Sequence, residues 1–452
     1  GIEYVAQLCD EAMEDLPLTI TNTAVEMGRI TKPIAATLKA EALVMAASPL
    51  FNGNKDFSFL EDNRGVKLFN DTEDPTKWNK AADACKKAID ICHEAEIRLF
   101  TFTDSRYPMS DTTRIGMSTR GAATIKWNQE LIWGNPVATS NTLQGKTIPY
   151  FKLEDKILGP DPEIYASFKM AELFYSNHGV PIEEDNEYNY ASRYDTTTVG
   201  GDHKYYIKEG LVTAILNTYR EPRFYASLGF DCGYWFGNGR TKDVDMGTST
   251  ETPWILAAKQ GEMSGKNGDI RYSQSGYFAK KASNFESATT STGSLVLTRS
   301  TYPIMRLADL YLLYAEALNE TLEVPNDEVY LYIDKVRERA GLRGVRESWA
   351  NYSKIPEKPL NKAGMREIIQ QERMIELCFE SKRYWDIRRW KKAQIYFNQT
   401  EQGWNVNQNM TVDYYNVVVF NQLNFTTKQY LWPISESEIR KNINLVQNPF
   451  WN

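Results

Sequence analysis

The chain has 452 residues, of which 42% are hydrophobic and 25% are charged, and its formal net charge at pH 7 is −7. This composition is globular, and the length allows two or three domains of about 150 residues. The negative charge argues against a nucleic-acid partner, because proteins that bind phosphates concentrate positive charge over one face. The longest apolar stretch, 42–51, is about half the length that a membrane-spanning helix needs. The cysteines are too few and too scattered for a disulfide scaffold.

Residues 1–100 are expected to form helices. Apolar residues recur there at intervals of three and four in two stretches, Ile34, Leu38, Ala42 and Met45, and then Trp78, Ala81, Cys85, Ala88 and Cys92. This spacing places each set on one face of a helix, and the pair Asp74-Pro75 marks a helix start. Paired helices of this kind resemble tetratricopeptide units, although no strict repeat is visible.

Residues 101–300 have a different texture, because they are rich in Gly, Ser, Thr and Asn and contain only short strand-like or helical runs. Segments such as SNTLQGKTIP (140–149) and TSTETP (248–253) are typical of turns. Loops this extensive in an otherwise globular chain are usually functional. We therefore expect this region to form the ligand side of the molecule.

The last third of the chain returns to a helical pattern, with helices expected over 306–320, 327–340 and 362–381. Apolar residues cover both sides of the first of these helices, namely Leu307, Leu310, Tyr311, Tyr314 and Leu318 on one side and Leu312 and Leu313 on the other. A helix that is apolar on both sides is sandwiched between layers, as stacked helical hairpins require.

The pattern as a whole predicts a mainly α fold with minor β structure. We expect a single interleaved unit over 1–452, in which 1–100 and 301–395 form a helical-hairpin scaffold similar to tetratricopeptide repeats. The loop-rich region 101–300 then forms the ligand side, and 396–452 forms a C-terminal segment.

The stretch 372–390 (ERMIELCFESKRYWDIRRW) is expected to be helical, with charges among its apolar residues. Glu372 and Glu376 lie on or beside the apolar face. Two carboxylates one turn apart repel each other, and burying them costs folding free energy unless cations pair with them. The cations expected to do so are Arg373, Arg383, Arg388 and Arg389. We interpret the cluster as a structural ion network, because no His or hydroxyl partner is spaced to complete a catalytic site.

The same stretch closely resembles the ER-x-x-EL-x-FE-x-x-R-x-x-D-x-RRW motif of the SusD/RagB family. Three further segments resemble motifs of this family and occur in the family's order: GRITKPIAATLKAEALVMAASPLFNG (28–53), YPIMRLADLYLLYAEALNE (302–320) and LWPISESEIRKNINLVQNPFWN (431–452). Members of the family begin with a secretion signal and a lipidated cysteine. Here Gly1 opens directly on a segment that resembles a helix inside the family's domain, so we expect the family's N-terminal segment to be absent.

The resemblance implies a surface-exposed lipoprotein of the outer membrane that captures oligosaccharides and delivers them to a SusC-like TonB-dependent transporter. It implies no catalysis, no cofactor and no metal, and a lipid anchor outside this chain. A peptide-binding relative on the same scaffold is the main alternative, and a helical-repeat interaction module is another. A secreted glycosidase also stays open: the chain lacks GxSxG, phosphate-loop and HExxH motifs, but a glycosidase needs only two carboxylates.

The residues expected to bind the glycan lie in and after two segments, 178–194 and 221–240, which resemble the parts of the family that supply its ligand cradle. We expect contact from Trp235, Tyr234, Tyr194, Trp254, Tyr190 and Arg240. Rigid aromatic rings are presented at little entropic cost, and polar groups fix the hydroxyls. Burial in the core is the competing interpretation for each ring, because alternation along a strand turns one of two neighbouring side chains inward.

Overall fold

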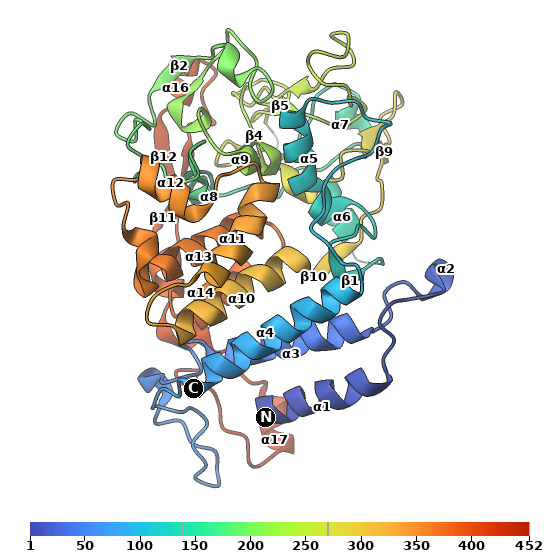
Figure 1. Ribbon diagram of the computed structural model, residues 1–452. Helices are drawn as coiled ribbons and strands as arrows, with labels where there is room; N and C mark the ends of the chain where they lie inside the picture. The colour runs from blue at the N-terminus through green and yellow to red at the C-terminus, as the bar shows by residue number, and fades with distance from the viewer. Residues whose placement is uncertain (138–139, 269–270, 452) are drawn as a thin grey trace.

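The fold has two parts, which draw on different regions of the chain. The computed structural model describes residues 1–137, 140–268 and 271–451. Helices from both ends of the chain, in blue and orange, form the lower part in Figure 1, and the middle of the chain, in green and yellow, forms the upper part. None of the helices in these ranges is long and apolar enough to cross a membrane.

Long helices from both ends of the chain pack together as the scaffold: α1 (Ile2–Asp15), α3 (Lys32–Ala47), α4 (Thr76–Glu94), α10 (Leu307–Thr321), α11 (Asp327–Arg339), α12 (Val345–Tyr352), α13 (Lys362–Glu376) and α14 (Arg383–Arg389). Helix α3 packs on α1 and α4, and α10 contacts α4, α11 and α13. Because α10 joins the N-terminal helices to the C-terminal ones, it is buried on both sides. The predicted mainly α architecture and the two-sided burial of α10 are confirmed.

Local sequence explains where the scaffold helices begin. The Asn326 side chain accepts the N–H groups of Glu328 and Val329 at 3.1 and 3.0 Å at the start of α11. In the same way, Asn361 accepts the N–H of Gly364 at 2.8 Å at the start of α13. Such caps satisfy N–H groups that have no partner within the helix.

The upper part consists of short elements around one longer helix, α5 (Asp111–Thr124). Helix α5 packs against α9 (Pro222–Ser227) and against the turn η4 (Lys280–Ala282).

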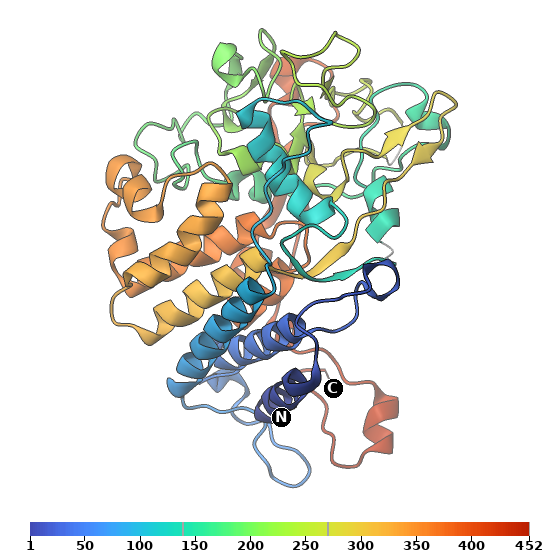
Figure 2. The ribbon, with the colours of Figure 1, turned by 45° about the vertical axis from the view of Figure 1, so that its right-hand side comes forward.

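The remaining helices of the molecule are α2 (Thr23–Glu26), α6 (Ser140–Gly145), α7 (Asp155–Leu158), α8 (Phe168–Leu173), α15 (Ala393–Phe397), α16 (Thr411–Tyr414) and α17 (Glu436–Lys441). Figure 2 shows α17 on an extended segment at the lower edge of the molecule.

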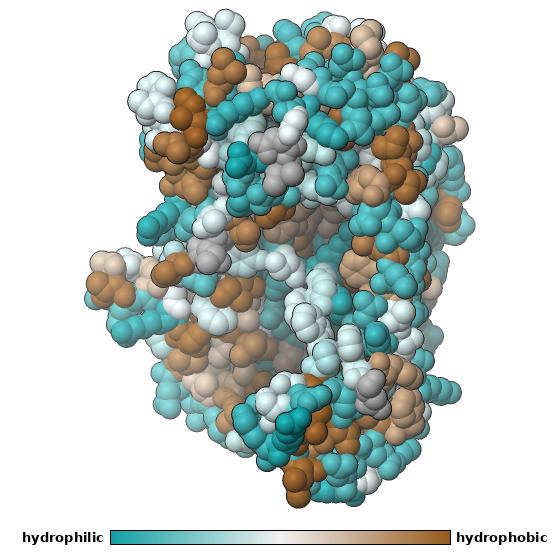
Figure 3. Space-filling model, turned by 180° about the vertical axis from the view of Figure 1, so that it is seen from behind, coloured by the Kyte–Doolittle hydropathy of each residue, from teal (hydrophilic) through white to brown (hydrophobic). Residues whose placement is uncertain are grey.

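The strands in the described ranges pair as antiparallel two-stranded ribbons. They are β1 (Leu131–Asn135) with β10 (Tyr302–Arg306), β2 (Thr196–Thr198) with β3 (Val212–Ala214), β4 (Leu228–Phe230) with β7 (Tyr277–Ala279), β5 (Tyr234–Trp235) with β6 (Trp254–Ile255), β8 (Ala288–Thr289) with β9 (Leu295–Val296), and β11 (Thr400–Trp404) with β12 (Val417–Gln422). The β1–β10 ribbon lies where the two parts meet (Figure 1). Seen from behind, the surface is hollowed between the upper part and the scaffold (Figure 3).

The closing stretch differs from the prediction, because 372–390 is not one continuous helix. A turn separates α13 from α14, and within it Phe379 and Ser381 have φ values of +63° and +62°. These values lie outside the helical region of backbone space. The turn carries Glu380 to Arg306, whose Nε lies 2.6 Å from the carboxylate. This contact between distant segments overrides the local helical periodicity.

Buried charges connect the scaffold to the upper part. Glu372 Oε1 lies 2.5 Å from Arg223 Nη1, and Glu376 pairs with Arg223, Arg306 and Arg339. Burial by itself raises the pKa of Glu376, but the neighbouring Arg339 and Arg306 outweigh that effect and hold its pKa below the usual value. The interpretation as a structural ion network therefore agrees with the geometry.

The arginines expected to answer these two carboxylates pair elsewhere, so that part of the prediction is wrong. Arg373 and Arg389 both pair with Asp386, whereas Arg383 and Arg388 lie over tyrosine rings. Successive side chains of a helix diverge by about 100° around its axis, so a sequence neighbour faces elsewhere. The cations that reach the carboxylates come from other elements.

Candidate functional site

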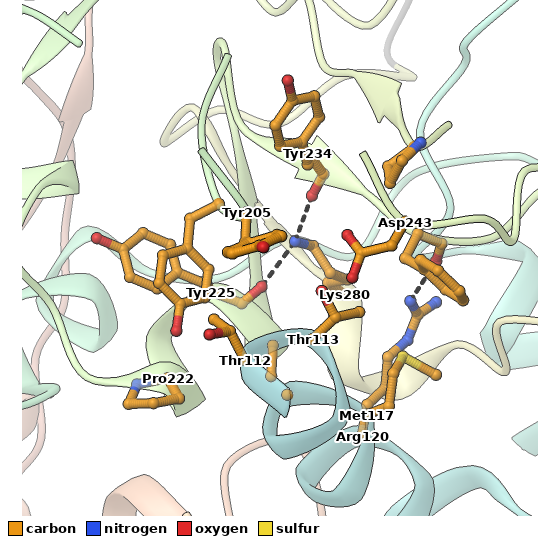
Figure 4. Close-up of a pocket in the computed structure, with 15 residues that line it drawn as sticks. Thr112, Thr113, Met117, Arg120, Tyr205, Pro222, Tyr225, Tyr234, Asp243 and Lys280 are labelled. Atoms are coloured by element: carbon orange, nitrogen blue, oxygen red, sulfur yellow. Dashed lines mark hydrogen bonds between the residues drawn. The ribbon is translucent and has the colours of Figure 1, made fainter. Parts of the chain in front are cut away.

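A pocket opens in the upper part beside the start of α5. Its empty space is partly enclosed by protein and partly open to solvent. Residues of α5, α9, β5, η4 and the loops before β3 and β6 line it. Figure 4 shows the lining residues, which include Thr112, Thr113, Met117, Arg120, Tyr205, Tyr206, Pro222, Tyr225, Tyr234, Phe236, Asp243, Pro253 and Lys280.

Tyrosine rings form much of the pocket wall. Tyr206 stacks on Tyr225 with ring centres 3.9 Å apart and planes 10° apart. The Tyr225 hydroxyl donates to the carbonyl of Asn217 at 3.0 Å, and the Tyr205 hydroxyl donates to Asp245 at 2.8 Å. Burial raises the pKa of Tyr206 to about 12, so its hydroxyl stays protonated at neutral pH. Because the protein itself holds these rings, less freedom is lost when a ligand binds.

Polar groups of the pocket lie at the start of α5. Thr112 and Thr113 belong to its first turn and line the pocket. Ser110 caps the helix by accepting the N–H of Thr113 at 3.2 Å. Asp243 in turn accepts the N–H groups of Ser110 and Val244, each at 2.8 Å. Asp243 therefore ties the loop before β6 to the N-terminus of α5, where a negative charge is favourable.

Two buried cations, Lys280 and Arg120, also line the pocket. The Lys280 ammonium donates to the carbonyls of Tyr225 and Tyr234 at 2.7 and 2.8 Å (Figure 4). The Arg120 guanidinium donates to the carbonyl of Phe236 at 2.6 Å. Burial lowers the pKa of both groups, that of Lys280 well below its ordinary value and that of Arg120 to about 9. The pocket thus places two basic side chains where burial disfavours their charged forms.

Trp235 was expected to present its ring to the ligand, but the structure places it in the core, where it is 1% exposed. Its neighbour on β5, Tyr234, takes the half-exposed position, as strand alternation requires. The indole lies 5.4 Å from the Arg120 guanidinium and 5.7 Å from Lys280 Nζ, within cation–π distance. Gly229 packs so close that a Cβ there would lie 2.9 Å from the indole. Trp235 therefore supports the two cations and has no face free for a sugar.

Trp254 and Arg240 contact each other, so each is already engaged within the protein. The Trp254 ring stacks on Phe151 with ring centres 5.6 Å apart and planes 22° apart. The Arg240 guanidinium lies 3.4 Å from the centre of the same indole. Both faces of Trp254 are therefore covered. Tyr234 does line the pocket, and Figure 4 shows its ring pointing away from Lys280 while its carbonyl faces the ammonium.

Tyr190 and Tyr194 belong to a different cluster. The Arg193 guanidinium lies over both rings, 4.0 and 4.1 Å from their centres. The Tyr194 hydroxyl donates to Glu172 at 2.6 Å, and Arg193 Nε lies 3.0 Å from the same carboxylate. Neither tyrosine lines the pocket. Of the six residues expected to bind the ligand, the structure thus brings Tyr234 alone to this pocket.

Sequence reasoning missed several lining residues. Tyr205 and Tyr206 form an adjacent aromatic pair between 178–194 and 221–240, and such a pair in a loop-rich region is a sequence signal for an aromatic site. Lys280 and Lys281 follow the apolar run Tyr277–Ala279, but lysines are rarely buried, so the sequence carries no signal that these two enter the interior. Asp243 likewise has no signal, because its role depends on the N-terminus of a helix far away in the sequence.

The site offers little for metal or acid–base chemistry. The described ranges contain no group of three or more His, Cys, Asp or Glu residues that could hold a metal ion. Among the described residues that line the pocket, Asp243 supplies the only carboxylate. Glycoside hydrolysis commonly uses a pair of carboxylates that flank the scissile bond. The described lining of the pocket thus presents one carboxylate where such hydrolysis uses two.

Known proteins resemble this chain in sequence and in fold. SusD-like protein P2 of Formosa agariphila (strain DSM 15362 / KCTC 12365 / LMG 23005 / KMM 3901 / M-2Alg 35-1) is 34% identical over 149 residues, which are 32% of this chain and 25% of that protein. The match thus spans about a quarter of the relative's length. The solved structure of BT4246 superposes with a TM-score of 0.82 at 24% identity, covering 100% of this chain and 76% of that one.

A crystal structure described as a SusD-like carbohydrate binding protein (BF0978) from Bacteroides fragilis NCTC 9343 is more distant. Its TM-score is 0.55 at 18% identity, and the match covers 98% of this chain and 70% of that one. At these identities the solved structures show a shared fold. The model of the SusD family matches residues 129–451, which is most of the chain. The chain therefore belongs to the SusD family.

Proposed function

We propose that the chain binds an oligosaccharide in the pocket beside α5 and does not alter it chemically. One observation carries the proposal: in a SusD family member, a preorganised tyrosine wall faces polar groups at the start of a helix. Tyr206 offers a flat apolar surface held by Tyr225, and Thr112, Thr113 and Asp243 offer hydrogen-bonding groups. Sites for small ligands commonly combine apolar walls with a few placed polar groups.

The same proposal includes delivery of the bound glycan. As a surface-exposed lipoprotein of the outer membrane, the protein passes the oligosaccharide to a SusC-like TonB-dependent transporter. Family membership supports this assignment, as does the description of the neighbour BF0978 as a carbohydrate binding protein.

Binding to immobilised glycans and to a peptide library tests the ligand class directly. We expect retention of oligosaccharides and none of peptides, with affinities then measured by titration calorimetry. Retention of peptides alone would instead place the protein with peptide-binding relatives. Incubating the protein with each bound oligosaccharide should yield no new reducing ends. Shorter products that disappear in an Asp243→Asn variant would show that the protein is a glycosidase.

A further inference from the structure

The pocket contains a buried lysine, Lys280, that forms no ion pair with a described carboxylate. Three lysines in the described ranges are buried: Lys259, Lys280 and Lys281. Lys259 pairs with Asp231 and Lys281 pairs with Glu380, each at 2.6 Å. No described carboxylate forms an ion pair with Lys280, although this residue is only 6% exposed. Lys259 and Lys281 thus each have a carboxylate partner within the protein, whereas Lys280, which lines the pocket, has none among the described residues.

The hydrogen bonds of Lys280 leave it able to bind a further group. An ammonium has three N–H donors, and two of them reach the carbonyls of Tyr225 and Tyr234. Nζ lies among the pocket-lining side chains in Figure 4. The carbonyls satisfy part of its hydrogen-bonding capacity but carry no net charge. A buried charge without a partner of opposite sign is costly, and an incoming anion would remove that cost.

The surroundings of Lys280 reinforce the positive field. Arg120 lines the same pocket, donates to backbone carbonyls and the Ser283 hydroxyl, and forms no ion pair with a described carboxylate. Burial, together with the nearby positive charge of Arg120, lowers the pKa of Lys280, and an anion bound beside it would favour the protonated form. Among the described lining residues the one carboxylate is Asp243, and the backbone N–H groups of Ser110 and Val244 partly offset its negative charge. The positive end of the α5 dipole meets the pocket at Thr112 and adds to the field.

We propose that the pocket selects glycans with an anionic substituent, a carboxylate or a sulfate ester, and that Lys280 binds this substituent directly. The inference rests on the proposed function, because the tyrosine wall and the threonine hydroxyls accommodate the sugar ring that carries the charge. Arg120 acts on the same substituent through its field, at longer range. Charge-assisted hydrogen bonds of this kind are about twice as strong as neutral ones.

Titration calorimetry on matched sugars tests the proposal. One pair is trigalacturonic acid and its methyl ester, and the other is a sulfated carrageenan oligosaccharide and its desulfated form. We expect the acidic member of at least one pair to bind roughly 10- to 100-fold more tightly than its neutral partner. The preferred pair identifies the substituent as carboxylate or sulfate. Equal affinities within both pairs would overturn the proposal while leaving glycan binding intact, and the absence of any glycan binding would overturn both.

Substitution of the lysine assigns the effect to one side chain. In Lys280→Met the preference for the acidic sugar should disappear while the neutral sugar still binds, which also shows that the pocket is folded. Lys208→Met removes an exposed lysine of the same region and should keep the preference. Persistence of the preference in Lys280→Met would contradict the proposal. If that variant does not fold, the comparison of acidic and neutral sugars on the unaltered chain decides.

Discussion

Arg306 Nη1 lies 2.8 Å from Glu376 Oε1, although the two residues are 70 positions apart in the chain. Both side chains are almost fully buried, one where β10 meets α10 and the other at the end of α13. The same carboxylate also pairs with Arg223 of α9 and Arg339 of α11. One buried anion thus holds together cations from both parts of the molecule, and this arrangement leads to the first two predictions.

Replacement of Glu376 by alanine should destabilise the fold severely. The change removes the carboxylate that pairs with the buried Arg223, Arg306 and Arg339. Breaking such a buried network typically costs about 3–5 kcal/mol of folding free energy. Urea unfolding followed by circular dichroism measures the loss. Glu436→Ala is the matched control, because the Glu436–Arg440 pair is exposed and should contribute less than about 1 kcal/mol. A Glu376→Ala variant as stable as this control would contradict the structural role of the network.

The free energy of unfolding should fall in acid. Nearby cations hold the pKa values of Glu376, Glu380 and Glu316 below the ordinary 4.5 despite burial. Lowered values in the folded state mean that these groups stabilise the fold above pH 4.5 and lose that contribution as the pH falls below it. Glu221 opposes the trend in part, because burial raises its pKa.

Urea unfolding at a series of pH values checks the acid dependence. We expect little change from neutral pH down to about pH 5 and a progressive loss below about pH 4.5. A Glu376→Gln variant should show a shallower decline, since one of the titrating groups has been removed. A decline of unchanged steepness in that variant would mean that other carboxylates dominate acid unfolding.

Trp235→Ala should act on stability. The indole is buried against the two cations of the pocket, so its removal creates a cavity and costs about 3–5 kcal/mol. Thermal melting measures the loss, and Trp385→Ala, at a 53% exposed indole, serves as the control with a small effect. A variant of Trp235 that melts normally and loses glycan affinity would show that the ring turns outward to meet the ligand.

Tyr206 should contribute its ring to glycan binding. By analogy with aromatic stacking on bases, Tyr206→Ala should lose about 1–3 kcal/mol, which corresponds to roughly five- to a hundred-fold in affinity. Tyr206→Phe keeps the ring stacked on Tyr225 and should retain most of the affinity. Calorimetric titration of both variants makes the comparison, with Tyr4→Ala on the exposed face of α1 as the control. Equal losses in the Ala and Phe variants would assign the effect to the hydroxyl.

Much of the scaffold could be predicted because helical periodicity is a local property. The helix expected over 306–320 is α10 (Leu307–Thr321), and the one expected over 327–340 is α11 (Asp327–Arg339). The exception is 372–390, where Glu380 leaves the helical path to reach Arg306. That partner lies in another element, so no pattern within the stretch indicates the turn.

The site was harder to predict, because being aromatic does not decide which way a ring faces. Tyr234 and Trp235 are neighbours on one short strand, and the twofold alternation of side chains turns one outward and the other inward. Only contacts with Gly229 and the two cations decide that the indole is the inner one. Trp254 and Arg240 were each expected to contact the ligand, but in the structure the Arg240 guanidinium lies over the Trp254 indole.

The sequence by itself determined the family, the mainly α class and the faces of the long helices, since motifs and periodicity are read along the chain. Only the tertiary structure decided which charges meet. Lys280 and Lys281 are adjacent and chemically identical, yet Lys281 pairs with Glu380, whereas Lys280 lines the pocket and forms no ion pair with a described carboxylate. The difference arises because successive side chains diverge, so each lysine meets a different set of distant segments. Electrostatic energy depends on distances through space, and folding alone sets those distances.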